Sequence, residues 1–241
     1  MNYDVFHITF NESNQEENWR RILDLHPNAK RLHGIKGIDR AHMACNSLAT
    51  TEWFWTVDGD NWITQPLIWT DINPRKDLLW FYALDPVTGK RLKNGGVKLW
   101  KRNSFINTDM SQGDFCVAAV QSKIAPDHVF SVTRYNATPY EGWKTAFRHC
   151  VKLLSRIFRD RPLAVNINHY LDIWRSYENL DDSSNNAIWC YQGYLDAEEY
   201  VKFCNDDLNL LYKINDYDWL KNYFFTKHEN IVSIRQRSQS Q

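Results

Sequence analysis

The first 58 residues alternate between short apolar segments and segments with helix signals. Residues 4–10, 29–32 and 52–57 are apolar and rich in strand formers, whereas residues 16–25 and 39–49 are typical of helices. Strand–helix–strand–helix–strand is the pattern of a parallel sheet with crossover helices, so we predict an α/β fold. Ligands of such sheets bind beyond the carboxyl ends of the strands.

The third predicted strand ends in two carboxylates, in the sequence FWTVDGDN. Side chains alternate along a strand, so Asp58 and Asp60 are expected to lean to the same side. They repel each other there unless a cation lies between them, and Mg²⁺ or Mn²⁺ suits such oxygen ligands. Asn11 and Glu12 follow the first strand and are expected at the same edge. The alternative is an ordinary solvated acidic turn.

Beyond residue 60 the pattern is less regular. Strands are expected over residues 78–84 and 97–101, and a long helix over residues 138–158 with Thr138 as its N-cap. After residue 160 the periodicity weakens, with one further helix over residues 196–203. We therefore expect one domain, with a core over residues 1–160, an extension packed on it over residues 161–232, and a flexible tail over residues 233–241.

Composition and cysteine usage predict a cytoplasmic protein. The chain has 241 residues, 43% of them hydrophobic, which is enough for a substantial core. It shows no signal peptide, and no apolar run approaches the roughly 20 residues of a membrane-spanning helix. Five cysteines without a Cys-x-x-Cys pair indicate reduced thiols. We expect no membrane contact and no obligate protein partner.

The net charge is zero, which argues against a nucleic-acid protein held by bulk charge. Two local clusters are basic: residues 86–108 carry six cations and no acid, and the helix over residues 138–158 carries cations at four-residue spacing. Each cluster is either a solvated face or a surface for the phosphates of a polynucleotide. The first contains Lys90, Arg91, Lys93, Lys98, Lys101 and Arg102, and the second contains Lys144, Arg148, Lys152 and Arg156.

Other residues with possible chemistry are scattered. Gly95 and Gly96 either form a hairpin turn after Asn94 or let the backbone approach a ligand closely. Asp114, which follows a glycine and precedes an apolar run, is the first candidate for a general base. The remaining candidates for a base or a third metal ligand are Asp109, Glu141, His149, His169 and His228.

A resemblance to a known family is carried by the segments DVFHITFNES, FWTVDGDN, NGGVKLW and GWKTAFRHCVKL, and the later segments LDIWRS and WCYQG also look similar to it. The first four segments resemble GT-A-type glycosyltransferases over about the first 155 residues, and within that group the bacteriophage enzymes that add sugars to hydroxymethylcytosine in DNA. The resemblance implies a GT-A-like, Rossmann-type mixed sheet flanked by helices, with an irregular or helical C-terminal extension. It also implies a UDP-sugar donor, with arabinose as a candidate sugar.

The resemblance assigns site residues as well. Asp60 would contact a Mn²⁺ or Mg²⁺ ion directly, and Asp58 would hold the ion or the ribose. A histidine near the C-terminus often adds a ligand in this family; His228 is taken as the candidate, and the alternatives are His169 or neither histidine. The donor would be bound by Thr9, Asn11, Glu12, Asp58, Gly95 and Gly96.

The expected reaction moves the sugar to a hydroxyl of 5-hydroxymethylcytosine in double-stranded DNA. The metal would stabilise the departing diphosphate, and an inverting reaction would need a base, Asp114 first and Glu141 second. A retaining reaction would not. The base would be flipped out of the duplex while the basic helix grips phosphates. The alternatives are a transferase acting on a glycan or small molecule, a non-catalytic binding domain on a transferase fold, and, least favoured, a metal-dependent phosphoesterase.

Overall fold

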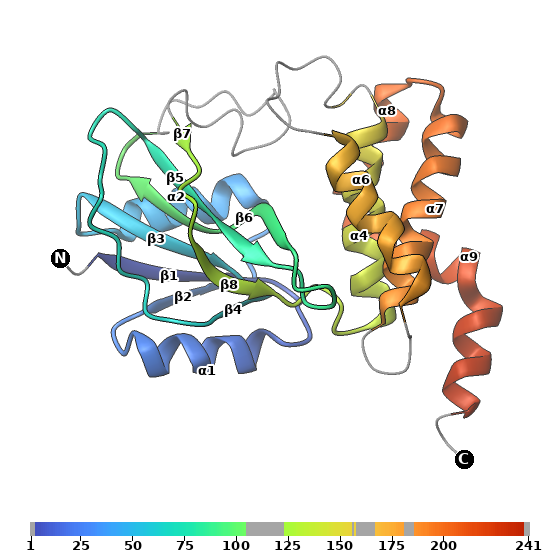
Figure 1. Ribbon diagram of the computed structural model, residues 1–241, viewed down its shortest axis with the longest axis horizontal. Coiled ribbons are helices and arrows are strands. Elements are labelled where there is room, and N and C mark those ends of the chain that lie inside the picture. Colours follow the sequence, from blue (N-terminus) through green and yellow to red (C-terminus); the bar gives the residue numbers. More distant parts are fainter. Residues whose placement is uncertain (1–2, 105–122, 156, 158–166, 181–185, 239–241) are drawn as a thin grey trace. The chain divides into compact units, whose positions relative to one another are not determined.

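The computed structural model of the protein describes residues 3–104, 123–155, 157, 167–180 and 186–238 (Figure 1). The chain forms two compact units, Met1–Tyr135 and Asn136–Gln241. The division falls earlier than residue 160, where the sequence suggested the core would end. The long helix after Thr138 therefore belongs to the second unit.

The first unit is built on one mixed sheet with the strand order β2-β1-β3-β6-β5-β8-β4, and β7 pairs with β5. β1 is parallel to both β2 and β3, whereas β6 is antiparallel to β3 and to β5. The α/β class predicted from the sequence is confirmed at this level. The strands are β1 (Asp4–Thr9), β2 (Lys30–His33), β3 (Trp53–Asp58), β4 (Asn61–Ile63), β5 (Leu78–Leu84), β6 (Arg91–Lys101), β7 (Lys123–Ile124) and β8 (Val129–Thr133).

The sheet curls strongly. β4 begins at Asn61, directly after the turn that follows β3, yet it lies at the far end of the strand order because it pairs with β8. Only Gly59 and Asp60 separate β3 from β4, so the far edge of the sheet must return to the end of β3. The Asp-Gly-Asp turn thus lies where two edges of the sheet meet.

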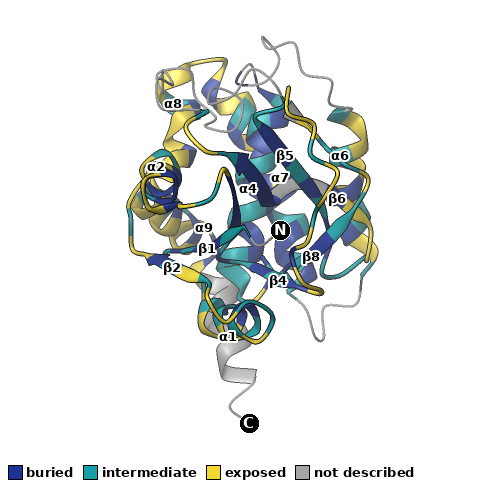
Figure 2. Cartoon of the chain, turned by 90° about the vertical axis from the view of Figure 1, so that its left-hand side faces the viewer, coloured by how far each residue is buried: buried dark blue, intermediate teal, exposed yellow. Residues whose placement is uncertain are grey.

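Helices cover the two faces of the parallel strands. α1 (Gln15–Leu25) buries Ile22 in a cluster with Trp55 and Val57, and α2 (Ile38–Leu48) buries Cys45 in a separate cluster on the other face. The outer surfaces of both helices are exposed (Figure 2). Alternation along β3 therefore sends Val57 toward α1 and Asp58 toward the face that α2 covers.

The glycine pair was one open question, and the structure excludes the hairpin reading. Gly95 and Gly96 lie inside the long strand β6, and the hairpin turn is formed instead by residues 85–90, with Gly89 at φ +65°. The second helix also differs slightly from expectation. Gly37, at φ +105°, occupies its N-cap, and Asp39 lies in its first turn.

The second unit is helical. Its elements are α4 (Pro139–Leu154), α6 (Ile167–Arg175), the 3₁₀ helix η2 (Ser176–Asn179), α7 (Ala187–Cys204), α8 (Leu208–Leu211), the 3₁₀ helix η3 (Tyr212–Asn215) and α9 (Tyr217–Ser238). α4 and α7 pack closely because Gly193 has no side chain: a Cβ there would lie 2.5 Å from the carbonyl oxygen of Trp143. One expectation was wrong here, since α7 begins nine residues before residue 196; α9 ends at Ser238, within the residues expected to form the tail.

A buried carboxylate connects three of these helices. Asp196 of α7 accepts hydrogen bonds from Trp143 Nε1 of α4 at 2.6 Å and from Gln192 Nε2 at 2.9 Å, and its Oδ2 lies 2.7 Å from His228 Nε2 of α9. Burial raises the pKa of Asp196, but the hydrogen bonds from His228 and Trp143 outweigh burial and leave that pKa lowered. Within the described residues, no helix has both the length and the apolar character needed to cross a membrane.

Candidate functional site

The candidate site lies at the carboxyl ends of β1 and β3. Ile8 of β1 is paired with Asp58 of β3, so the loops that follow these two strands start side by side. Glu12 in the first loop reaches the turn after β3: a Cβ at Gly59 would lie 2.6 Å from its carboxylate. Glu12 is itself fixed by the backbone N–H of Phe10, which donates to Oε2 at 2.8 Å. The expectation that Glu12 lies near the Asp-Gly-Asp turn therefore agrees with the geometry.

Asp58 is paired with a lysine of the neighbouring strand. Lys98 Nζ lies 3.0 Å from Oδ2 and 3.2 Å from Oδ1 of Asp58. The Lys98 side chain is only 4% exposed, whereas that of Asp58 is 30% exposed. Lys98 lies opposite Thr56 in the antiparallel pairing of β3 with β6, which places it on the same face of the sheet as Asp58.

This pair changes the interpretation of both residues. A buried ammonium is strongly unfavourable without a counter-charge, and Asp58 supplies it through both carboxylate oxygens. Lys98 is therefore not part of a basic surface for phosphates, contrary to the expectation for residues 86–108. Of the other cations in that cluster, Arg91 forms an ion pair with Asp127 and Lys101 donates to the carbonyl of Pro74.

Asp60 is oriented by a buried amide. Asn61 Nδ2 donates to Asp60 Oδ1 at 2.8 Å, while Asn61 Oδ1 accepts from the hydroxyls of Ser131 at 2.8 Å and Thr133 at 3.1 Å. The two hydroxyl donors fix which end of the amide faces Asp60. Asn61 is 1% exposed, and Asp60 is half-buried.

Gly96 makes room for this amide. A Cβ at Gly96 would lie 2.3 Å from Asn61 Nδ2 and 2.4 Å from Asn61 Oδ1, far inside van der Waals contact. Of the two glycines expected to line the donor, Gly96 therefore has a structural role, because it leaves space for the Asn61 side chain. Because Gly96 has no side chain, β6 packs directly against Asn61, which donates the hydrogen bond that orients Asp60.

The backbone of the turn is held by α1 and by the residue that follows β8. Asn18 Nδ2 donates to the carbonyl of Gly59 at 2.8 Å, and the backbone N–H of Arg134 donates to the carbonyl of Asp60 at 2.7 Å. Arg134 also pairs with Glu17 at 2.9 Å. The two carboxylates therefore project from a turn whose backbone has fixed hydrogen-bond partners.

Two histidines near this end of the sheet are held neutral. Burial lowers the pKa of His42 to about 3, with the charge of Lys98 acting in the same direction. Burial also lowers the pKa of His7 to about 3, assisted by the charge of Arg31. Burial and the charge of Asp58 raise the pKa of the Cys45 thiol, so Cys45 is not a ready nucleophile.

The other predicted donor residues differ in accessibility. Thr9 is 2% exposed, and its hydroxyl accepts from Arg31 Nε at 3.0 Å and contacts His33 Nδ1 at 3.0 Å. The Thr9 hydroxyl therefore links β1 to β2. Asn11 is exposed in the loop after β1.

The described residues at the turn could supply only some of the ligands of a metal ion. Among the described residues, no group of three or more histidine, cysteine, aspartate or glutamate side chains is arranged to hold an ion. Asp60 nevertheless offers a half-buried, oriented carboxylate, and Mg²⁺ is commonly bound through one or two carboxylates plus substrate phosphates. Asp58 fits the metal less well, because Lys98 engages both of its oxygens.

His228 does not have the surroundings of a metal ligand. It is 3% exposed, its Nε2 is engaged with Asp196, and its ring packs against Trp189 and Phe224. This environment makes it part of the buried network of the second unit. The alternative, His169, is exposed on α6 of the same unit.

The predicted catalytic residues are not assembled by the described part of the chain. Glu141 forms a capping box with Thr138: its N–H donates to Thr138 Oγ1 at 3.2 Å, and that hydroxyl donates to Glu141 Oε2 at 3.0 Å. Its role is to start α4. His149 accepts a hydrogen bond from Trp174 Nε1 at 3.0 Å. Asp109 and Asp114 lie outside the described residues.

The basic stripe of α4 is largely engaged within its own unit. Arg148 Nε donates to the carbonyl of Ile214 at 2.8 Å, and its guanidinium lies 5.0 Å from the ring centre of Tyr217. Lys144 Nζ lies 5.5 Å from the ring centres of both Tyr140 and Tyr217. Lys152 is half-buried, and Arg156 lies outside the described residues. The cations of the stripe thus hold α4 against the start of α9. Because they already have these partners, the interpretation of the stripe as a phosphate-binding surface is weakened.

Sequence reasoning missed Lys98, Asn61 and Asn18 as parts of the site. A signal existed for Lys98, since VKLWK alternates and Lys98 occupies the same face as buried Trp100. Asn61 directly follows Asp60, but nothing in the sequence reveals that it meets β8.

No protein-family model matches the chain, and no curated protein matches it.

Proposed function

We propose that the protein is a metal-dependent GT-A-type glycosyltransferase that uses a UDP-sugar donor. The observation that carries the proposal is the placement of Asp60, an oriented and partly accessible carboxylate at the carboxyl end of a central parallel strand. Ligands of α/β sheets bind at this edge. The sequence resemblance of DVFHITFNES and FWTVDGDN to that family supports the same conclusion.

In this proposal Asp60 holds Mn²⁺ or Mg²⁺, which would supply positive charge for the departing diphosphate. The chain's own residues prepare the edge for that metal cation. Glu12, Asp58 and Asp60 bring three carboxylates, and Lys98 cancels the charge of one of them. Asn61 keeps the Asp60 carboxylate in one orientation, so little reorganisation is needed when the donor arrives.

The acceptor we propose is the hydroxyl of 5-hydroxymethylcytosine in double-stranded DNA, with arabinose as the candidate sugar. It rests on the resemblance to the bacteriophage enzymes. If transfer inverts the sugar, Asp114 is the proposed base, whereas Glu141 is occupied as a helix cap. Such a reaction would take place in the cytoplasm, where the described free cysteines Cys45, Cys150, Cys190 and Cys204 stay reduced.

One observation favours a second acceptor class. Lys98 and Arg148, two of the cations expected to grip DNA, have internal partners. A transferase acting on a glycan or a small molecule would not need a phosphate-binding surface. That activity is the second candidate.

The test is sugar transfer followed by mass spectrometry. Protein, Mn²⁺ and a panel of UDP-sugars are incubated with DNA containing cytosine or hydroxymethylcytosine. We expect a sugar mass gain only on hydroxymethylcytosine DNA, lost in Asp60→Asn and retained in Asp24→Asn, an exposed aspartate on α1. UDP release without DNA gain would support the second candidate. Absence of both gain and UDP release would refute the transferase.

A further inference from the structure

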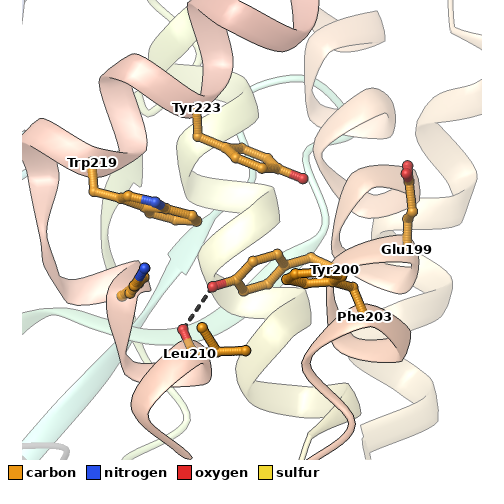
Figure 3. Close-up of a pocket in the computed structure, with 7 residues that line it drawn as sticks. Glu199, Tyr200, Phe203, Leu210, Trp219 and Tyr223 are labelled. Atoms are coloured by element: carbon orange, nitrogen blue, oxygen red, sulfur yellow. Dashed lines mark hydrogen bonds between the residues drawn. The ribbon is translucent and has the colours of Figure 1, made fainter. Parts of the chain in front are cut away.

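The helical unit contains a pocket that the proposed transferase site does not use. It has a volume of about 410 Å³, within the usual range for small-ligand sites, and lies between α7, α9 and the short helices that connect them (Figure 3). Its lining residues are Glu199, Tyr200, Phe203, Leu210, Lys213, Trp219 and Tyr223.

Four aromatic rings form the walls. Trp219 and Tyr223 of α9 are stacked with centroids 5.0 Å apart, and Tyr200 of α7 lies 5.4 Å from Trp219. The Tyr200 hydroxyl donates to the carbonyl of Leu210 at 2.6 Å, so Tyr200 contributes its ring and not a free hydroxyl (Figure 3). Phe203 is 72% exposed, which is unusual for a side chain of this size and apolarity. The pocket therefore offers ring faces to a flat ligand.

The two charged residues that line the pocket differ in whether they have an ion-pair partner. Glu199 is paired with Lys227, whose Nζ lies 2.5 Å from its Oε2 and also 3.4 Å from Asp196 Oδ1, so one ammonium serves two carboxylates. The ammonium of Lys213 makes no hydrogen bond or ion pair with any residue in the described part of the chain. An aromatic cage would also attract an organic cation, but Lys213 on its wall repels one.

Two aspartates near the pocket do not reverse this balance. Asp207 Oδ1 accepts from the N–H of Asn209, and Asp216 Oδ1 accepts from the N–H groups of Asp218 and Trp219. Both carboxylates thus bind backbone N–H groups at the starts of helices, and neither lines the pocket.

We propose that this pocket binds a nucleobase that carries a phosphate. The flat base stacks on the rings of Phe203 and Trp219, and the phosphate pairs with Lys213. The base can come from a free nucleotide or from a single strand of nucleic acid, since both present the same chemistry. The inference stands apart from the proposed transferase activity and needs no metal.

The test is isothermal titration calorimetry of the full chain in EDTA, which removes any metal-dependent binding at Asp60. We expect AMP to bind and the affinity to fall at least about fivefold in Phe203→Ala and in Lys213→Gln. Matched controls are Phe225→Ala and Lys221→Gln, which alter exposed residues of α9 outside the pocket. Adenosine should bind more weakly than AMP and be insensitive to Lys213→Gln, and inorganic phosphate alone should not bind.

The outcomes separate the alternatives. An eight-nucleotide single strand that binds much more tightly than AMP would identify a strand as the source, and equal affinities would identify a free nucleotide. Tetramethylammonium binding in preference to AMP would overturn the proposal in favour of a cation cage. AMP binding that ignores Phe203→Ala and Lys213→Gln, or no AMP binding, would also overturn it, whatever the result of the transferase assay.

Discussion

The ammonium of Lys98 is bound to both carboxylate oxygens of Asp58, and Lys98 is the more deeply buried partner. Asp58, the first aspartate of the Asp-Gly-Asp turn, therefore has a structural role that requires no ligand, because it neutralises the buried charge of Lys98. Asp60, two residues later, is oriented by a neutral amide instead. The two aspartates look equivalent in the sequence but have different partners in the fold.

This asymmetry predicts unequal effects on stability. Asp58→Ala leaves the Lys98 ammonium buried and unpaired. Breaking a buried ion pair costs about 3–5 kcal/mol, and we expect the loss in the free energy of unfolding to lie at the lower end of that range. Lys98→Met leaves only a partly exposed carboxylate and should cost less. The double variant Asp58→Ala/Lys98→Met should recover much of the loss. Urea unfolding measures all three, and additive losses in the double variant would show that the pair is not coupled.

Gly96 provides a second prediction. Alanine at this position would force Asn61 out of its place, so we expect Gly96→Ala to lower the free energy of unfolding by about 1–3 kcal/mol. Sugar transfer should fall as well, because Asp60 would lose its hydrogen-bond donor. Gly89→Ala is the control: it adds backbone strain at φ +65° but meets no atom within 4 Å, so it should destabilise without changing the activity of the folded protein.

The sequence predicted the parallel strands and their helices well, because those segments follow the two-residue and 3.6-residue periods that burial imposes. It failed where partners are distant in the chain. Asn61 meets Ser131 seventy residues later, and no local pattern encodes that contact. The Thr138–Glu141 spacing of a capping box is visible in the sequence, but it does not by itself distinguish a helix cap from a catalytic carboxylate. A carboxylate's role depends on its neighbours in space, as Asp58 also shows.

The buried histidines predict a loss of stability in acid. The pKa values of His7 and His42 are lowered to about 3 in the folded protein, from the ordinary value of 6.5. Below pH 6.5 the unfolded chain binds protons that the folded chain does not, so stability is present above 6.5 and is lost as the pH falls toward 3. Each histidine contributes a slope of about 1.4 kcal/mol per pH unit in that window.

Urea unfolding between pH 7 and pH 4.5 measures this slope. His42→Gln should reduce the slope by the contribution of one histidine, about 1.4 kcal/mol per pH unit. His169→Gln, at an exposed position, should leave the slope unchanged. An unchanged slope in His42→Gln would contradict the neutral, buried state of that histidine.

The last prediction concerns the metal. If Asp60 is the residue that contacts it, Asp60→Asn should abolish Mn²⁺ binding in the presence of UDP, measured by electron paramagnetic resonance. Asp58→Asn keeps the shape of the side chain but loses the charge that Lys98 needs, so its main effect should be on stability, with Mn²⁺ affinity reduced much less. His228→Gln should leave Mn²⁺ binding intact and destabilise the helical unit, because Asp196 loses a buried partner. Equal losses of Mn²⁺ in Asp58→Asn and Asp60→Asn, measured at a temperature where both are folded, would mean that the ion draws Asp58 away from Lys98. The two aspartates would then act as one ligand set, as the sequence first suggested.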